Sequence, residues 1–239
     1  MSQFRNTILS ALSEREVERL TAKGGARVEL PFQKPIYQAG DRIEFVYFPE
    51  GCLMSLVRTN QDGQTVESGL CGYEGAVALT EACGSQTTSA QTVVQVAGPA
   101  WRFRHEECCA LASESRRAQR AFFANAEFQL IEARQSALCR SFHQGEARMA
   151  RWFLEYRKRS QVQATLPITQ EFLAAMLGVQ RTTVTALARE MKADGLIDYT
   201  RGKVTLLDLK GLQQISCDCG AQLDEERARV HSSLGLTNA

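Results

Sequence analysis

The spacing of apolar residues from 166 to 195 predicts two short helices joined by a tight turn. The first helix is expected to begin near Thr169, whose hydroxyl can accept a hydrogen bond from the free amides of a first turn. Gly178 then stands where a left-handed residue ends a helix, and the second helix is expected from about Gln180. The two apolar faces comprise Leu173, Met176 and Leu177 in the first helix and Val184, Leu187, Ala188 and Met191 in the second.

A β-hairpin is predicted directly after these helices. Gly195 ends the second helix, and the β-prone segments 197–199 and 204–206 flank Arg201 and Gly202, which form a cationic turn. Two helices, a tight turn and a hairpin in this order are the layout of a winged helix-turn-helix that reads DNA. The alternative is an ordinary helical subdomain with a solvated polar face, because the same geometry occurs in proteins that bind no DNA.

The side chains on the exposed faces of this unit suit contact with DNA. Arg181 stands near the start of the second helix, and its planar guanidinium can pair with guanine O6 and N7, a contact worth about 1–3 kcal/mol of discrimination. Threonine hydroxyls can bond to either base type, and the other cations, with Lys192 among them, are expected on phosphates. The candidate DNA-binding residues are Thr169, Gln180, Arg181, Thr182, Thr185, Arg189, Arg201 and Lys203.

Residues 166–210 resemble the DNA-binding domain of the Crp/Fnr family of bacterial transcription regulators. The resemblance rests on TQEFLAAMLGVQRTTVTALAREM and the following DGLIDYTRGKVTLLD. The family often has Glu where Thr182 stands and Arg where Ala186 stands, so its consensus operator is not carried over. Arg181 matches the position at which some members read guanine. The resemblance implies a DNA-binding transcription regulator, with RNA polymerase as a further partner.

Residues 113 to 143 predict one long helix with two apolar stripes. One stripe has the spacing of a coiled-coil seam and comprises Phe123, Ala126, Leu130, Ala133 and Ala137. The other comprises Phe128, Ile131, Leu138 and Phe142. Two buried faces need two partners, and the simplest are the barrel of the same chain and the same helix of a second subunit. We therefore expect a homodimer on a near-palindromic operator, the alternative being a helix buried within a monomer.

The segment 146–159 predicts a helix that braces the DNA-binding unit. Its shared apolar face comprises Met149, Trp152, Phe153 and Tyr156. The helix ends in Arg157, Lys158 and Arg159. This end is expected to be solvated rather than to contact phosphate, because runs of charge usually are.

Short β-prone runs separated by turn signals fill residues 28–103. The expected turns lie at Gly40-Asp41, Pro49-Glu50-Gly51, Asp62-Gly63, Gly72 and Gly98-Pro99. Regularly spaced short strands predict an antiparallel sandwich or barrel. The region is similar to the cyclic-nucleotide-binding jelly roll of the Crp/Fnr family.

The phosphate-binding segment of that jelly roll runs roughly Gly-Glu-x-x-Leu, followed later by Arg-Ser-Ala or Arg-Thr-Ala. The corresponding candidate effector pocket comprises Gly75, Ala76, Leu79, Thr88, Ser89 and Ala90. Ala76 replaces the Glu that holds the ribose hydroxyl, and Thr88 replaces the Arg that neutralises the phosphate. Losing such a charged partner costs about 2–5 kcal/mol. The barrel is therefore not expected to bind cyclic AMP, and its effector is unknown.

The net charge of +1 conceals a local excess of positive charge. Residues 1–113 hold 10 Lys/Arg and 13 Asp/Glu, residues 114–210 hold 16 and 10, and residues 211–239 hold 2 and 4. Attraction to DNA depends on local charge, so the near-neutral total is no obstacle. No apolar run approaches about 18 residues and no signal-peptide pattern opens the chain, so we expect a cytoplasmic protein with no membrane partner.

The eight cysteines do not form the pattern of a disulfide scaffold. His105, Cys108 and Cys109 could share a helical face, and Cys217 and Cys219 stand close together near the end of the chain. Either group could bind a soft metal or act as a thiol switch, but free cysteines are more often buried small hydrophobes. The N-terminal region has no cysteine before Cys52 and no clustered set of four ligands, so an iron-sulfur cluster is not expected there. We expect no metal and no cofactor.

Two other classes of protein fit less well. A cupin-type enzyme needs several metal-binding histidines or carboxylates, and the chain has 3 histidines with no His-x-His pair. A cyclic-nucleotide-like or thiol- or metal-sensing signalling module without DNA reading would leave the helix-turn-helix without a role. No Gly-rich phosphate loop, nucleophile elbow or zinc-enzyme motif occurs, so the chain is not expected to be an enzyme.

The predicted fold class is α+β, with an N-terminal antiparallel β jelly-roll barrel, a long dimerisation helix and a C-terminal winged helix-turn-helix. The expected domains are residues 1–113 for the sensor barrel with an N-terminal helix, 114–143 for the dimerisation helix, 144–210 for the DNA-binding domain and 211–239 for a C-terminal tail.

Overall fold

The computed structural model describes residues 4–160, 165–200 and 202–235. The chain forms two compact units. The barrel unit comprises residues 1–58, 68–133 and 224–239, and the helix-turn-helix unit comprises residues 59–67 and 134–223. Among the described residues, no helix is both long and apolar enough to cross a membrane.

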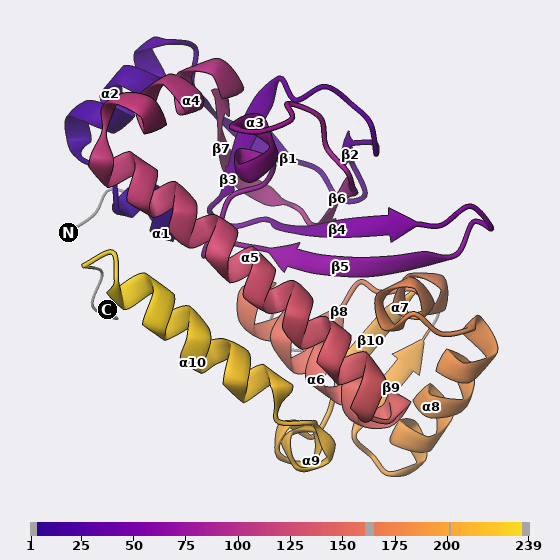
Figure 1. Ribbon diagram of the computed structural model, residues 1–239. Coiled ribbons are helices and arrows are strands. Elements are labelled where there is room, and N and C mark those ends of the chain that lie inside the picture. Colours follow the sequence, from indigo (N-terminus) through magenta and orange to yellow (C-terminus); the bar gives the residue numbers. More distant parts are fainter. Residues whose placement is uncertain (1–3, 161–164, 201, 236–239) are drawn as a thin grey trace. The chain divides into compact units, whose positions relative to one another are not determined.

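Two antiparallel sheets form the framework of the barrel unit (Figure 1). One sheet has the strand order β1-β7-β3 and the other has the order β2-β6-β4-β5. The strands are β1 Ala26–Leu30, β2 Pro35–Tyr37, β3 Phe45–Pro49, β4 Leu53–Thr59, β5 Thr65–Cys71, β6 Gln91–Val96 and β7 Gly98–Arg104. The antiparallel β architecture expected for this part of the chain is confirmed.

Successive side chains of a strand point to opposite faces of the sheet, so apolar residues at alternate positions point into the core. Val46 and Phe48 of β3 and Phe103 of β7 are fully buried, and the rings of Phe48 and Phe103 meet edge to face with centroids 5.6 Å apart. One expected turn is wrong, because Gly98 and Pro99 begin β7 and pair with the end of β1. The φ of 159° at Gly98 is extended backbone, so this Gly-Pro pair continues into a strand.

Short helices accompany the sheets. They are α1 Thr7–Ser10, α2 Glu14–Ala22, α3 Leu79–Ala82 and α4 His105–Glu114. The single N-terminal helix expected from the sequence is therefore two helices, since α1 ends before α2 begins. The start of α2 is fixed by Glu16, whose carboxylate accepts the backbone N–H of Ser13 at 2.6 Å.

The long helix α5, Arg116–Phe142, confirms the expected long helical segment. The predicted seam lies on its exposed side, where Phe123 and Leu130 are 67% and 49% exposed. The second stripe is not continuous as expected. Phe128 is buried in an apolar cluster with Ala124 and Val230 of the barrel unit, whereas Leu138 and Phe142, which belong to the helix-turn-helix unit, are exposed.

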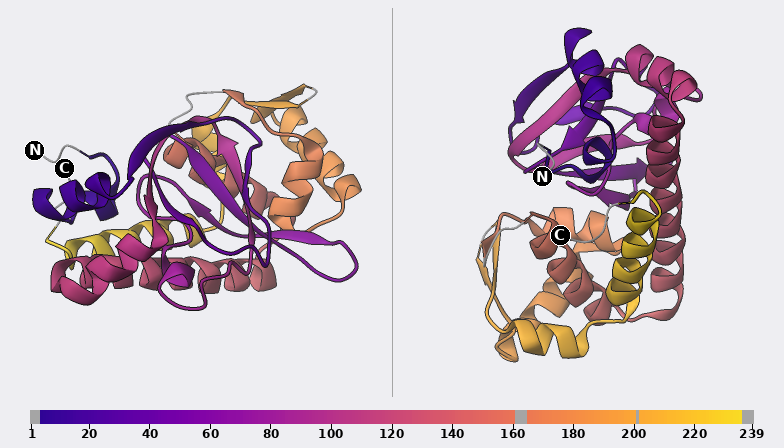
Figure 2. Two further views of the ribbon diagram at one scale, coloured as in Figure 1. Left: turned by 90° about the horizontal axis from the view of Figure 1, so that it is seen from above. Right: turned by 90° about the vertical axis from the view of Figure 1, so that its left-hand side faces the viewer.

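The last part of the chain is helical, although the sequence analysis assigned it only as a tail. It forms α9, Leu209–Ile215, and α10, Cys219–Ser232. In the barrel unit, α10 lies beside α5, as Figures 1 and 2 both show, and Arg229 of α10 pairs with Glu127 of α5 at 2.9 Å. Arg227 lies over the ring of Phe128, 5.2 Å from its centroid. α10 therefore covers Phe128, a position that the sequence analysis assigned to the barrel.

The helix-turn-helix unit combines helices with a small sheet of order β8-β10-β9. Its further elements are α6 Gly145–Ser160, β8 Thr165–Leu166, α7 Gln170–Leu177, α8 Arg181–Ala193, β9 Ile197–Thr200 and β10 Lys203–Leu206. The expected helix before it is confirmed, with Trp152 and Tyr156 buried on one face. Its end is not fully solvated as expected: Arg159 is buried because it follows Trp152 and Tyr156 on that face at the spacing i, i+4, i+7.

The loop before α3 is held by buried side-chain amides. The backbone N–H of Ala76 donates to Oδ1 of Asn125 in α5 at 2.8 Å, and the Ala76 carbonyl accepts from Nε2 of Gln129 at 3.0 Å. Nδ2 of Asn6 donates to the Gly75 carbonyl at 2.8 Å. Asn125 and Asn6 are 3% and 0% exposed, so water has little access to replace these bonds.

Replacing Asn125 with Ala is expected to destabilise the barrel unit by about 1–3 kcal/mol, because the buried N–H of Ala76 would lose its acceptor. The matched control is Asn60→Ala. Asn60 accepts the N–H of Gln64 at 2.8 Å in an exposed turn, where water can take its place. Urea denaturation should show a clearly larger drop in the midpoint for Asn125→Ala, and equal drops for the two variants would contradict the role given to burial.

Candidate nucleic-acid interface and effector site

The turn between α7 and α8 forms as its residue types require. Oγ1 of Thr169 accepts the N–H of Phe172 at 3.1 Å, which caps the start of α7. Gly178 ends α7 with a φ of 63°, a left-handed conformation that glycine adopts without steric cost. Val184, Ala188 and Met191 face inward from α8 and are at most 4% exposed. The helix-turn-helix predicted from the sequence is confirmed.

The outer face of α8 carries most of the predicted DNA-binding residues. Gln180, Arg181, Thr182 and Arg189 are exposed. The first turn of α8, which the structure describes completely, holds no acidic residue. An anionic backbone approaching this end of the helix meets an arginine, hydroxyl groups and free backbone amides.

Thr185 behaves differently from its predicted neighbours. Its side chain is partly buried, and its hydroxyl lies 3.2 Å from Oε1 of Gln170 and 3.0 Å from the carbonyl oxygen of Arg181. The hydroxyl is therefore engaged between α7 and α8. Thr185 positions the recognition helix in this structure, and a contact with a base requires it to exchange these partners.

The wing, the hairpin of β9 and β10, follows α8 and is joined to it by an ion pair. Lys192 of α8 forms an ion pair of 2.6 Å with Asp198 of β9, and this contact lowers the pKa of the Asp198 carboxyl. In the hairpin, exposed Lys203 is paired in register with Thr200, and Gly202 has a φ of 76° in the turn. The predicted contact at Arg201 lies outside the described residues.

The predicted effector-pocket residues lie close to the barrel core. Ala76 and Thr88 are 0% and 5% exposed. Oγ1 of Thr88 donates to the Ala90 carbonyl oxygen at 2.9 Å and accepts the backbone N–H of Ala90 at 3.2 Å. The guanidinium of exposed Arg58 donates to the carbonyl of Ser89. These residues thus form hydrogen bonds among themselves through short polar side chains and backbone groups, and Arg58 adds a positive charge beside Ser89.

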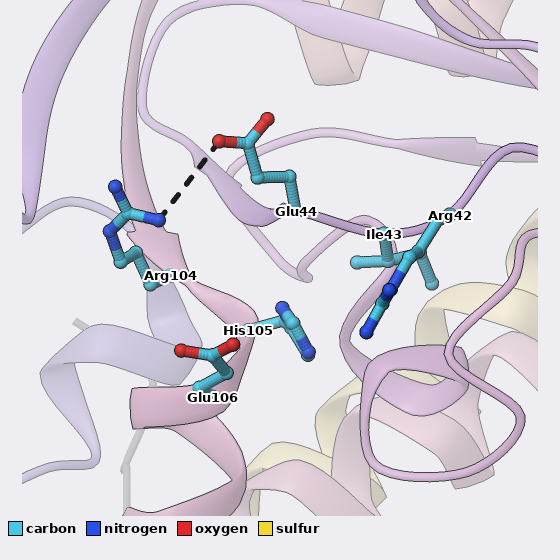
Figure 3. Close-up of a pocket in the computed structure, with 6 residues that line it drawn as sticks. All are labelled: Arg42, Ile43, Glu44, Arg104, His105 and Glu106. Atoms are coloured by element: carbon cyan, nitrogen blue, oxygen red, sulfur yellow. Dashed lines mark ion pairs between the residues drawn. The ribbon is translucent and has the colours of Figure 1, made fainter.

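A surface cavity of about 420 Å³ opens elsewhere in the barrel unit (Figure 3). It is lined by Arg42, Ile43, Glu44, Arg104, His105 and Glu106. Arg104 and Glu44 lie at an ion-pair distance of 4.0 Å, and His105 lies between the two arginines in Figure 3. None of the predicted pocket residues lines this cavity. The sequence analysis missed it because its charged residues come from two segments about 60 positions apart, with no motif joining them.

The two cysteine groups named from the sequence have different outcomes. His105, Cys108 and Cys109 do not form one site: Cys108 is buried in the apolar core, where burial raises its pKa, and Sγ of Cys109 lies 3.3 Å from Sγ of Cys83.

Cys217 and Cys219, in contrast, meet Cys139 of α5 and His143, which directly follows the end of α5. The four donor atoms lie within 4.8 Å of one another. The sequence analysis missed Cys139 and His143, although a spacing of four residues places them on one face of a helix.

Comparison with known proteins supports the architecture. Residues 147–215 match the family described as the Crp-like helix-turn-helix domain. No curated protein sequence matches the chain. The solved structure of the c-di-GMP responsive global regulator CLP from Xanthomonas campestris aligns with a TM-score of 0.68 at 18% identity, covering 82% of this chain and 100% of that one.

Two transcriptional regulators from Thermus thermophilus are also similar. One, of the CRP family, aligns with a TM-score of 0.69 at 16% identity and covers 79% of this chain and 96% of its own. The other, of the CRP/FNR family, aligns with a TM-score of 0.67 at 23% identity and covers 80% of this chain and 98% of its own. At these identities the likeness establishes the fold. The chain has the fold of Crp/Fnr regulators, which confirms the resemblance found in the sequence.

Proposed function

We propose that this chain, whose residues 147–215 form a Crp-like helix-turn-helix domain, is a non-enzymatic transcription regulator that binds double-stranded DNA as a homodimer. The observation that carries the proposal is the exposed outer face of α8, which presents Arg181 and Thr182 from a first turn without acidic residues. A signalling module that binds no DNA would leave this face without a role. RNA polymerase is the further partner that the family resemblance implies.

In this proposal α8 enters the major groove of DNA. Arg181 reads a guanine through its planar guanidinium, and Thr182 contacts a neighbouring base edge or methyl group. Arg189 and Lys203 bind phosphates, and Arg201 is kept from the sequence analysis as a further phosphate contact. Thr185 holds α8 against α7 through Gln170, so that the reading side chains keep a fixed orientation.

The homodimer is proposed from the two opposite faces of α5. The inner face is buried within the barrel unit, with Ala121 and Phe128 at 0% and 5% exposure. The predicted seam points the other way and leaves Phe123 and Leu130 exposed. Exposed aromatic and aliphatic side chains at coiled-coil spacing suit the same helix of a second copy. Such a dimer places two recognition helices about 34–36 Å apart on a near-palindromic operator.

The barrel is proposed to respond to something other than cyclic AMP. Neither Ala76 nor Thr88 carries a charge, and the backbone N–H of Ala76 is already bonded to Asn125. A cyclic nucleotide bound at this segment would lose the water around its phosphate. No cation from Ala76 or Thr88 would compensate for that loss. The CLP protein, to which this chain is similar in fold, is described as responsive to c-di-GMP.

Arg181→Ala is expected to weaken binding to the operator about 10-fold or more while leaving nonspecific binding nearly unchanged, because a base contact is lost. Lys203→Ala is expected to weaken binding to both kinds of DNA, since a phosphate contact carries no sequence information. Fluorescence anisotropy with operator and scrambled duplexes measures both effects. Lys34→Ala, an exposed lysine of the barrel unit, is the control. Equal losses on both duplexes for Arg181→Ala would remove it as a reader.

Leu130→Glu is expected to convert the dimer to monomers, because it places two carboxylates against each other in an apolar contact across the two-fold axis. Analytical ultracentrifugation measures the mass. The control is Phe32→Glu, which changes an apolar side chain of similar exposure, 42% against 49%, outside α5. A Leu130→Glu protein that stays dimeric would place the interface elsewhere.

Cyclic AMP is expected to show no saturable binding at micromolar concentration in calorimetry, and the affinity for operator DNA is expected to be the same with and without it. Saturable micromolar binding coupled to tighter DNA binding would overturn this expectation. In that case, Arg58→Ala would test whether the arginine beside Ser89 supplies the missing positive charge.

A further inference from the structure

Four soft or borderline metal ligands converge in the helix-turn-helix unit. Cys139 and His143 stand one turn apart near the end of α5, and Cys217 and Cys219 stand at the start of α10. Sγ of Cys139 lies 3.6 Å from Sγ of Cys217, and Sγ of Cys219 lies 3.4 Å from Nδ1 of His143. Two of the four residues are buried and two are partly buried, so the group lies largely out of solvent.

These separations match a tetrahedral metal centre. Zinc bonds thiolate sulfur at about 2.3 Å and imidazole nitrogen at about 2.0–2.1 Å, so a tetrahedral site separates two sulfurs by about 3.8 Å and a sulfur from a nitrogen by about 3.6 Å. The two separations in this structure lie within about 0.2 Å of these values. An iron-sulfur cluster holds several irons and sulfides between its cysteines, and a set of donors that all lie within 4.8 Å is tight for it.

The surroundings of the group also suit a metal ion. Oδ1 of Asp218 lies 3.8 Å from Nε2 of His143, on the side of the ring away from Cys219. A carboxylate in that position favours the proton on Nε2 and leaves the Nδ1 lone pair for a metal.

We propose that Cys139, His143, Cys217 and Cys219 bind one zinc ion in a closed tetrahedral site. All four positions come from the protein, which is the pattern of a structural rather than a catalytic zinc. The ligands flank the Crp-like domain on both sides, two before residue 147 and two after residue 215. The ion thus joins the helix that enters this domain to the helix that leaves it, and closes a chain segment whose ends are 78 residues apart.

A disulfide accounts for fewer of these observations. It would join two of the three sulfurs and give no role to His143 or to the carboxylate beside it. In this structure all eight cysteines are free. The zinc site uses all three sulfurs, the imidazole and Asp218 together. The inference does not rest on the proposed function, because it concerns side chains that the DNA-reading face of α8 does not include.

The test measures metal in the full-length protein purified under reducing conditions and supplied with zinc. Elemental analysis after gel filtration is expected to give one zinc per chain for the unaltered protein and for Cys83→Ser, an exposed cysteine of the barrel unit. Cys217→Ser is expected to lose most of this zinc. Cobalt added to the metal-free protein is expected to give the visible bands of a tetrahedral thiolate site, and these bands should be lost in Cys217→Ser.

Three further variants keep the proposal testable where Cys217→Ser does not fold. His143→Cys preserves four ligands and is expected to keep zinc, whereas His143→Ala is expected to lose it. Asp218→Asn leaves every ligand in place and is expected to weaken zinc binding about 10–100-fold in competition with a chelator. Equal zinc content in all variants would overturn the proposal. So would iron with acid-labile sulfide in place of zinc, or the absence of cobalt bands from the unaltered reduced protein.

Discussion

The opposite faces of α5 are the constraint on which the structure of this chain depends. One face must pack in the barrel unit, where Ala121 is buried, Asn125 fixes the backbone at Ala76, and α10 covers Phe128. The other face leaves Phe123 and Leu130 in water, at an unfavourable free energy of hydration that a second copy of the helix can relieve. The same helix carries Cys139 near its end in the helix-turn-helix unit, and His143 directly follows its last residue. Residues of one helix and its end therefore serve the packing of the barrel unit, the proposed dimer interface and the proposed zinc site.

The helix-turn-helix could be predicted from the sequence because its determinants are local. Thr169 caps the first helix, Gly178 takes the left-handed conformation, and the apolar stripe of α8 repeats at helical spacing. Each of these signals acts within a few residues. Thr185 was predicted on an exposed face and instead bonds to Gln170, fifteen positions away. The apolar periodicity predicts which face of the helix a residue lies on, but it does not predict the hydrogen-bond partner of its hydroxyl group.

Contacts between distant segments account for what the sequence did not reveal. α10 pairs with α5 through Arg229 and Glu127, which are 102 positions apart, and no periodic pattern in either helix specifies that partner. The sequence pointed to the Cys217-Asp218-Cys219 segment as a possible metal or thiol site. Two cysteines are too few for a tetrahedral site, and only the fold brings Cys139 and His143 to them. The segment around Ala76 was predicted as the effector pocket from its resemblance to the family. The structure adds that the side chain of Asn125 accepts the backbone N–H of Ala76. Backbone groups leave no signature in the sequence of side chains.

The ion pair between Lys192 and Asp198 changes how many counterions the recognition surface can displace. A cation that neutralises a DNA phosphate releases condensed ions from the duplex and steepens the logarithmic salt dependence of binding by about 0.9. Lys192 already faces a carboxylate at 2.6 Å, so it brings little net charge to a phosphate. In the proposed complex with DNA, the salt dependence of binding then reports Arg189 and Lys203 more than Lys192, and it is expected to be shallower than the number of lysines and arginines around α8 implies. Removing the Asp198 carboxylate would break this ion pair and leave Lys192 able to bind a phosphate. The wing would then lose its ion pair with α8, while the protein would be attracted more strongly and less selectively to any duplex.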